Sequence, residues 1–169
     1  MNKVLVIGGG GREHALSWRL KQSPSVAEVF CSPGNAGIAQ DVTCVALSGA
    51  SEIVEFCKNQ NISLVVIGPE QPLVDGVSDS LRQAGIATFA PSQKAAQLEA
   101  SKGFMKNLCA KYNIPTAAYG FFANKAEALA FLEGKNFPIV VKADGLAAGR
   151  AAHEKKQGRC DQAASGSVT

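Results

Sequence analysis

Short apolar runs alternate with helix-like patterns along the first 90 residues, and this alternation constrains the fold more than any other feature. The runs are apolar at successive positions, as in strands that are buried on both faces of a parallel sheet. We expect strands at 4–7, 26–31, 42–46, 64–67 and 86–90, and helices at 12–21, 51–59 (N-cap Ser51) and 74–85. The pattern predicts an α/β domain in which right-handed crossovers place helices on both faces of a parallel sheet.

The first expected strand runs directly into four glycines, Gly8–Gly11, and then into Arg12, Glu13 and His14. A glycine turn between a strand and a helix directs backbone N–H groups and the helix dipole at one point, which favours a phosphate. The dinucleotide fingerprint G-x-G-x-x-G fits poorly, because Glu13 or His14 occupies its last glycine position, and the acidic residue expected about 20 residues later is missing. A small phosphorylated ligand is therefore favoured over a nicotinamide cofactor, with a purely structural turn as the alternative.

Two further loops follow other expected strands. Pro33–Gly37 comes after the second strand and Gly68–Leu73 after the fourth. Ligands of open parallel sheets bind beyond the carboxyl ends of the strands, so the three loops predict one site at that edge.

The pattern changes after Pro91. We expect helices at 92–99 and 102–112 with a break near Ser101, and a strand at 118–122. A helix that Asn124 caps and Gly134 ends should follow, then a strand at 138–142 and a glycine-rich loop at 143–149. From Arg150 onward no apolar periodicity remains, which predicts a disordered segment.

The composition excludes several classes of protein. The 169 residues carry a formal net charge of +3, which gives no support for nucleic-acid binding through a basic surface. No apolar run approaches a membrane span and the start leads directly into a strand, so we expect a cytoplasmic protein that contacts no membrane. The five cysteines are scattered without a C-x-x-C pair, which indicates reduced thiols rather than a disulfide framework or a zinc site.

Five motifs in order resemble the glycinamide ribonucleotide synthetase family, the phosphoribosylamine–glycine ligases of the ATP-grasp superfamily. The motifs lie at 6–15, 33–37, 68–74, 95–102 and 141–149. The resemblance implies a Rossmann-like pre-ATP-grasp, substrate-binding α/β domain at 1–100. It further implies the first half of an ATP-grasp domain at 101–149 and a tail outside the family at 150–169.

The resemblance also implies a reaction. Such ligases join glycine to 5-phosphoribosylamine through a glycyl phosphate, with ATP and Mg²⁺ or Mn²⁺, and produce glycinamide ribonucleotide for purine biosynthesis. The implied partners are these small molecules, and the implied oligomeric state is a monomer or a weak dimer.

The family motifs assign candidate site residues. The implied substrate contacts are Gly9, Gly10, Gly11, Arg12, Glu13, His14, Asn35, Pro69, Glu70 and Asp144. The implied ATP contacts are Lys106, Lys142, Gly145 and Gly149. No metal ligand is assigned in this chain.

The sequence departs from the family pattern after Gly149, where Arg150 and small or charged residues follow. The second half of the ATP-grasp domain and its metal ligands are missing, so we expect an amino-terminal fragment that is inactive alone. A non-catalytic sugar-phosphate- or nucleotide-binding module is the alternative, and a fragment of a Rossmann dehydrogenase is a third hypothesis.

Overall fold

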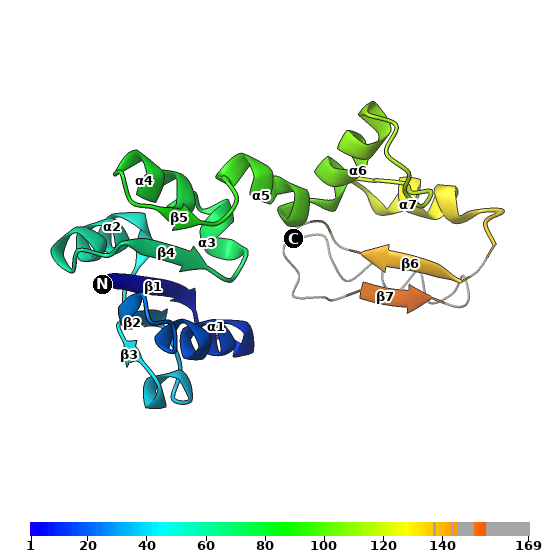
Figure 1. The fold of residues 1–169 in the computed structure, drawn as a ribbon. Coiled ribbons are helices and arrows are strands. Elements are labelled where there is room, and N and C mark those ends of the chain that lie inside the picture. Colours follow the sequence, from blue (N-terminus) through cyan, green and yellow to red (C-terminus); the bar gives the residue numbers. More distant parts are fainter. Residues whose placement is uncertain (137, 143, 145–150, 155–169) are drawn as a thin grey trace. The chain divides into compact units, whose positions relative to one another are not determined.

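The computed structural model describes residues 1–136, 138–142, 144 and 151–154, and for the last four it describes the backbone alone. The chain divides into two compact units, Met1–Gln97 and Leu98–Thr169. Figure 1 shows the elements of both units, which are described in turn.

The first unit is built on a five-stranded sheet in the order β3-β2-β1-β4-β5, and all of its pairs are parallel. Its strands are β1 (Asn2–Gly8), β2 (Val26–Pro33), β3 (Thr43–Cys44), β4 (Leu64–Ile67) and β5 (Thr88–Phe89). The chain builds outward from β1 to one edge and then returns to add β4 on the other side. This order confirms the predicted parallel α/β fold and places a topological switch point between β1 and β4.

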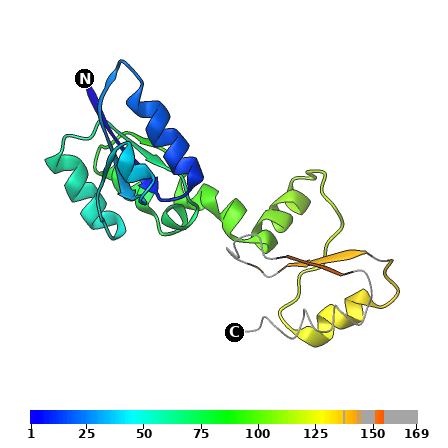
Figure 2. The same cartoon turned by 90° about the horizontal axis from the view of Figure 1, so that it is seen from below.

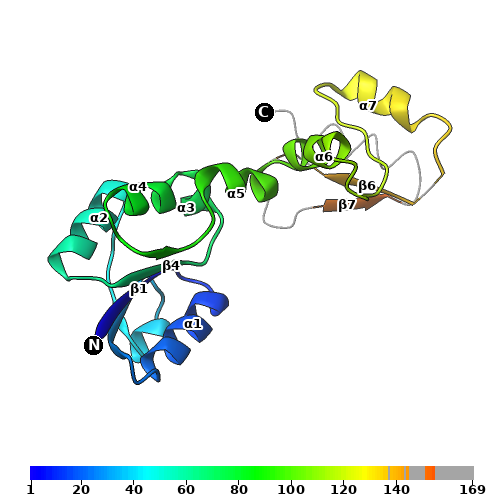
Figure 3. The ribbon, with the colours of Figure 1, turned by 45° about the horizontal axis from the view of Figure 1, so that its top comes forward.

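Helices cover both faces of this sheet (Figure 3). The helical elements of the unit are α1 (Gly11–Lys21), η1 (Ile38–Gln40), α2 (Gly49–Asn59), α3 (Gln71–Val74) and α4 (Val77–Gln83). Leu5 and Ile7 of β1 pack with residues of α2, α3 and α4, whereas Val4 and Val6 pack with Ile38 and with α1 on the opposite face. The central strand is therefore buried on both sides, as its continuous apolar run predicts.

Several boundaries differ from the prediction. Helix α2 begins at Gly49 rather than after Ser51, and the N–H of Ser48 at its N-cap donates to Oε2 of Glu52 (2.6 Å). The expected helix at 74–85 is two helices, because Gly76 adopts a φ of +82° between α3 and α4. Strands β3 and β5 each contain two residues and are shorter than predicted.

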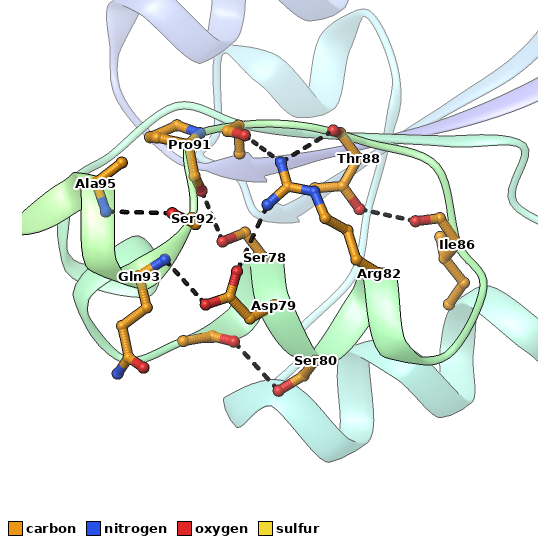
Figure 4. A network of polar contacts seen from close by, with 12 residues as sticks. Ser78, Asp79, Ser80, Arg82, Ile86, Thr88, Pro91, Ser92, Gln93 and Ala95 are labelled. Carbon is orange, nitrogen blue, oxygen red and sulfur yellow. Dashed lines mark hydrogen bonds and ion pairs between the residues drawn. The ribbon is translucent and has the colours of Figure 1, made fainter.

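Polar contacts of α4 attach the end of β5 and the start of α5 (Gln93–Ala100) to the first unit (Figure 4). The buried Ser78 hydroxyl donates to the carbonyl of Pro91 (2.7 Å). The Asp79 carboxylate accepts from the N–H of Gln93 (3.0 Å), and Arg82 donates to the carbonyl of Ala90. These contacts fix the connection that follows the last strand of the sheet.

The second unit contains α6 (Lys102–Lys111), α7 (Lys125–Leu132) and an antiparallel pair of strands, β6 (Ile139–Lys142) and β7 (Ala151–Glu154) (Figure 2). Ser101 and Asn124 cap α6 and α7 by accepting from Phe104 N and Glu127 N (both 3.0 Å). The predicted break near Ser101 and the predicted cap at Asn124 are confirmed.

Two predictions for this unit are wrong. No strand forms at 118–122: Phe121 packs against Gly103 of α6, and the Phe122 ring lies 5.0 Å from that of Phe131 in α7. These aromatic residues therefore contact helices while remaining partly exposed, and they have no partner strand. Disorder from residue 150 onward is wrong for Ala151–Glu154, because pairing with β6 orders a segment that has no apolar periodicity of its own.

Candidate functional site

Three loops meet at the carboxyl edge of the sheet in the first unit, as predicted. The N–H of Gly34 donates to the carbonyl of Gly8 (3.2 Å), and the side chain of Asn35 donates to the carbonyl of Gly9 (2.7 Å). On the other side of β1, the N–H of Gly68 donates to the carbonyl of Ile7 (3.0 Å). The glycine turn thus lies between the other two loops: it is bonded directly to the second loop, and the third loop is bonded to the end of β1 just before it.

Glu13 lies beneath these loops rather than on the surface. Its side chain comes from the first turn of α1 and is 3% exposed, and Oε2 accepts the N–H of Gly10 (2.7 Å). A Cβ added at Gly8 would lie 2.5 Å from Glu13 Cγ, and one added at Gly68 would lie 2.6 Å from Cδ. Two of the motif glycines therefore make room for this carboxylate, which positions the turn.

The start of α1 is the most accessible part of the edge. Helix α1 begins at Gly11, so the N–H groups of its first turn have no acceptor within the helix. A Cβ added at Gly11 would meet no atom within 4 Å, which means that this position faces open space. At Gly9, in contrast, a Cβ would lie 2.7 Å from the carbonyl oxygen of Gly34. The turn is packed on the side of the second loop and open above the helix terminus.

Arg12 and Glu70 connect the turn to the third loop across this opening. The Arg12 side chain is 68% exposed, and its Nη2 lies 3.3 Å from Oε1 of Glu70. Exposed ion pairs contribute about 0–1 kcal/mol to stability, so an incoming anion can replace the carboxylate at little cost. Pro69, beside Glu70, packs under the turn, where its Cδ would lie 2.9 Å from a Cβ at Gly8.

His14 and Asn35 hold the second loop in place. His14 Nε2 lies 2.8 Å from Oδ2 of Asp41, and Asn35 Oδ1 accepts from the N–H groups of Gly37 (2.8 Å) and Ile38 (2.9 Å). The sequence analysis does not identify Asp41, because it follows the loop without belonging to any motif. Both predicted ligand contacts therefore have structural partners within the protein.

A cleft of about 310 Å³ adjoins the edge, next to the ends of β1 and β2. Pro33 and Pro72 line it and belong to two of the three loops. Its remaining lining is mostly apolar, with Ser32 and Asp75 as polar members. Residues of α2 and α4 contribute to these walls, so the cleft lies on the face of the sheet that these helices cover.

The second unit holds the other candidate residues. Asp144 caps α6: Oδ1 accepts from the N–H groups of Lys102 (2.6 Å) and Gly103 (3.3 Å), and Oδ2 accepts from the Ser101 hydroxyl (3.0 Å). This carboxylate therefore stabilises a helix terminus within the protein.

The predicted ATP contacts differ in their surroundings. The Lys106 ammonium donates to Thr116 Oγ1 (2.7 Å) and to the carbonyl of Ala117 (3.0 Å). Lys142 is exposed at the end of β6, while Gly145 and Gly149 lie outside the described residues.

Metal ligands and membrane spans were also sought in the described parts of the chain. Among those residues, no group of three or more His, Cys, Asp or Glu side chains could hold a metal ion. No helix within them is long and apolar enough to cross a membrane.

Comparisons with known proteins identify relatives of both units. Residues 2–99 match the family model for the N domain of phosphoribosylglycinamide synthetase, and residues 100–162 match its ATP-grasp (A) domain. The second match continues past Gly149, where the sequence analysis ended the resemblance.

The similar proteins include phosphoribosylamine–glycine ligases from Rhizobium meliloti (53% identical) and Agrobacterium fabrum (54% identical), each over 150 residues. Each alignment covers 88% of this chain and 36% of the relative. A crystal structure of the ligase from Thermotoga maritima matches with a TM-score of 0.73 and 30% identity, over 95% of this chain and 38% of that one. The chain thus spans about a third of the length of the relatives that it matches.

Proposed function

The chain belongs to the phosphoribosylglycinamide synthetase family, and we propose that it supplies the sugar-phosphate-binding part of a phosphoribosylamine–glycine ligase. The observation that carries the proposal is the open N-terminus of α1 beside the exposed Arg12, where three loops meet. The ligase activity and its substrates belong to the proposal as well, since the chain spans about a third of its relatives.

The 5-phosphate of phosphoribosylamine binds in front of the first turn of α1. The unpaired N–H groups there donate to phosphate oxygens, and the helix dipole favours the negative charge. Arg12 exchanges Glu70 for the phosphate and adds a charge-assisted contact. Gly9, Gly10 and Gly11 let the phosphate approach the backbone, since no side chain stands between the strand and the helix.

The sugar lies beside the third loop. Once Arg12 has turned to the phosphate, the Glu70 carboxylate is able to accept a hydrogen bond from a ribose hydroxyl or from the 1-amino group. His14, Asn35 and Pro69 shape the walls of the site through the contacts described above. Glu13 acts through the turn that it positions.

In the whole ligase, the glycine carboxylate takes the γ-phosphoryl group of ATP and becomes glycyl phosphate. The amine of the bound sugar attacks the acyl carbon, phosphate leaves with the electrons of the C–O bond, and the nitrogen loses a proton to give glycinamide ribonucleotide. Lys106 and Lys142 contribute positive charge to the ATP phosphates. The described residues hold no metal-binding group, so we assign no step to Mg²⁺ or Mn²⁺.

Calorimetric titration with ribose 5-phosphate, a stable analogue of the amine substrate, tests this proposal. We expect the 169-residue chain to bind ribose 5-phosphate and Arg12→Ala to bind it about tenfold more weakly, because a charged hydrogen bond contributes about 1.5–3 kcal/mol. Arg19→Ala is the matched control, since Arg19 is exposed in the last turn of the same helix.

The alternatives predict other outcomes. Binding of NAD without binding of ribose 5-phosphate would overturn the proposal in favour of a dehydrogenase fragment. Equal binding by the wild type and Arg12→Ala would show that the Arg12 side chain does not contact the ligand, and this would contradict a binding site at the start of α1. We expect no glycinamide ribonucleotide from this chain alone with glycine, ATP and Mg²⁺, because it spans about a third of the length of its ligase relatives.

A further inference from the structure

Two of the five cysteines, which are far apart in the sequence, face each other in the sheet. Cys31 near the end of β2 is the direct partner of Cys44 in β3. Neighbouring strands lie about 4.7–4.9 Å apart, and disulfides join residues whose Cα atoms are about 4.4–6.8 Å apart. The backbone spacing therefore suits a disulfide without movement of either strand.

Both side chains lie on the same face of the sheet. Cys31 is fully buried in the cluster that contains Val4, Val6 and Ile38, and Cys44 packs against that cluster. A Cβ added at Gly34 would overlap the sulfur of Cys44 and lie 3.8 Å from Cβ of Cys31. The two cysteines therefore flank the same glycine, and each is free in this structure.

The two thiols differ in their surroundings. The Cys31 thiol donates to the carbonyl of Gly8 (3.3 Å), and burial raises its pKa. Cys44 is partly exposed and contacts the carbonyl of Asn35 (3.9 Å). An oxidant from solution therefore reaches Cys44 first, because Cys31 is buried. Cys31 is the second thiol to react.

We propose that Cys31 and Cys44 form a reversible redox-modification site, which a peroxide converts to an intramolecular disulfide beneath the loop at 34–37. The Cys44 thiolate attacks one peroxide oxygen, so an S–O bond forms, the O–O bond breaks and water leaves after protonation. The Cys31 sulfur then attacks the sulfur of the resulting sulfenic acid: the S–S bond forms, the S–O bond breaks, and the thiol proton of Cys31 joins the departing hydroxide as a second water. Two thiols and one hydrogen peroxide thus give one disulfide and two waters.

The disulfide changes contacts of the candidate site. It removes the S–H donor at Gly8 and draws Cys44 away from Asn35, and both carbonyls belong to loops of the carboxyl edge. Gly34, which lies against Cys44, also bonds to Gly8. We expect the oxidised protein to bind ribose 5-phosphate several-fold more weakly than the reduced protein, a consequence that rests on the proposed function.

Peptide mapping after treatment with hydrogen peroxide tests the site itself. Remaining thiols are blocked with N-ethylmaleimide, and the chain is cleaved before Asp41 and after Glu52, which separates Cys31, Cys44 and Cys57. We expect one linked pair of peptides, carrying Cys31 and Cys44 and lighter by two hydrogen atoms, which dithiothreitol separates. Cys44→Ala should abolish the link, and Cys57→Ala, which alters another buried cysteine of the same unit, should keep it.

Other products would overturn the proposal. These are a link from Cys44 to another cysteine, a link between two chains, or irreversible oxidation of Cys44 with Cys31 still blocked by N-ethylmaleimide. This mapping does not depend on sugar-phosphate binding. If the disulfide forms but the reduced chain fails to bind ribose 5-phosphate, the redox site stands and the proposed function fails.

Discussion

Glu13 determines which residues the surrounding loops can carry. Its carboxylate is buried, accepts the N–H of Gly10, and fills the space that a side chain at Gly8 or Gly68 would need. The glycines of this motif suggest a phosphate-binding turn, but two of the glycines around it also leave the space that a buried carboxylate needs. Gly11, which faces open space, is the motif glycine without such a packing constraint.

Gly68→Ala should destabilise the first unit by about 1–3 kcal/mol, because the new methyl group overlaps the Glu13 carboxylate in a well-packed site. Urea unfolding followed by Trp18 fluorescence measures this, since Trp18 is the single tryptophan of the chain and lies in α1. Gly11→Ala is the matched control, and we expect it to be neutral or stabilising by about 0.5–1 kcal/mol, as for glycine to alanine within a helix. A stable Gly68→Ala variant would contradict the packing role of Glu13.

Removal of Glu13 should make the alanine at position 68 harmless. Glu13→Ala alone should cost about 1–3 kcal/mol, because the N–H of Gly10 loses its acceptor. In the double variant Glu13→Ala/Gly68→Ala the overlap disappears, so we expect a coupling energy of about 1–3 kcal/mol between the two sites. Additive losses in the same unfolding experiment would show that the two residues do not share the space.

At the scale of elements, α2 is held to the sheet by its buried face, which includes Ile53 and Cys57. Burial raises the pKa of the Cys57 thiol from 9.0 to about 11. Because the unfolded chain then ionises at lower pH than the folded chain, stability from this group is complete below pH 9 and is lost as the pH rises toward 11.

Unfolding free energies at pH values below 9 and near 11 should reveal this loss. We expect the wild type to lose about 2–3 kcal/mol more than Cys57→Ala over that interval, since one pKa unit corresponds to about 1.4 kcal/mol. Parallel curves for the two proteins would indicate that the thiol ionises equally in both states.

Helix α6 depends on a cap that comes from a distant part of the sequence. Asp144 accepts two N–H groups at the start of α6, in addition to the cap from Ser101. Asp144→Ala should speed hydrogen exchange at Lys102 and Gly103 by about five- to tenfold, which corresponds to a lost cap of about 1 kcal/mol. Glu133→Ala, an exposed carboxylate after α7, is the control and should leave that exchange unchanged. Unchanged exchange in Asp144→Ala would contradict the capping role.

At the scale of the whole molecule, the predicted features that the structure confirms depend mainly on residues that lie close together in the sequence. The strand at 64–67, the break near Ser101, the cap at Asn124 and the convergence of three loops are confirmed by the structure. Features that depend on distant partners were not predicted: strand β7 exists through pairing with β6, and the opposition of Cys31 and Cys44 requires the register of two strands.

In the candidate site, too, features built from neighbouring residues could be predicted, and contacts between distant residues could not. The glycine turn and the start of α1 directly after it could be predicted, because a strand, a turn and a helix are contiguous in the sequence. The burial of Glu13 under Gly68 could not, since those residues meet only when β1 and β4 are paired. The same applies to the pairing of His14 with Asp41 across the second loop.

The central claim is that a sugar phosphate binds at the start of α1, and amide chemical-shift mapping tests it most directly. On titration with ribose 5-phosphate, the account predicts the largest shifts at the N–H groups of Gly9–Arg12, with smaller shifts at Asn35 and Glu70. Inorganic phosphate should reproduce the shifts at the turn and give a smaller shift at Glu70, because it draws Arg12 away from Glu70 but offers no sugar hydroxyl. Shifts confined to other parts of the first unit, or no shifts at all at saturating ligand, would contradict the account.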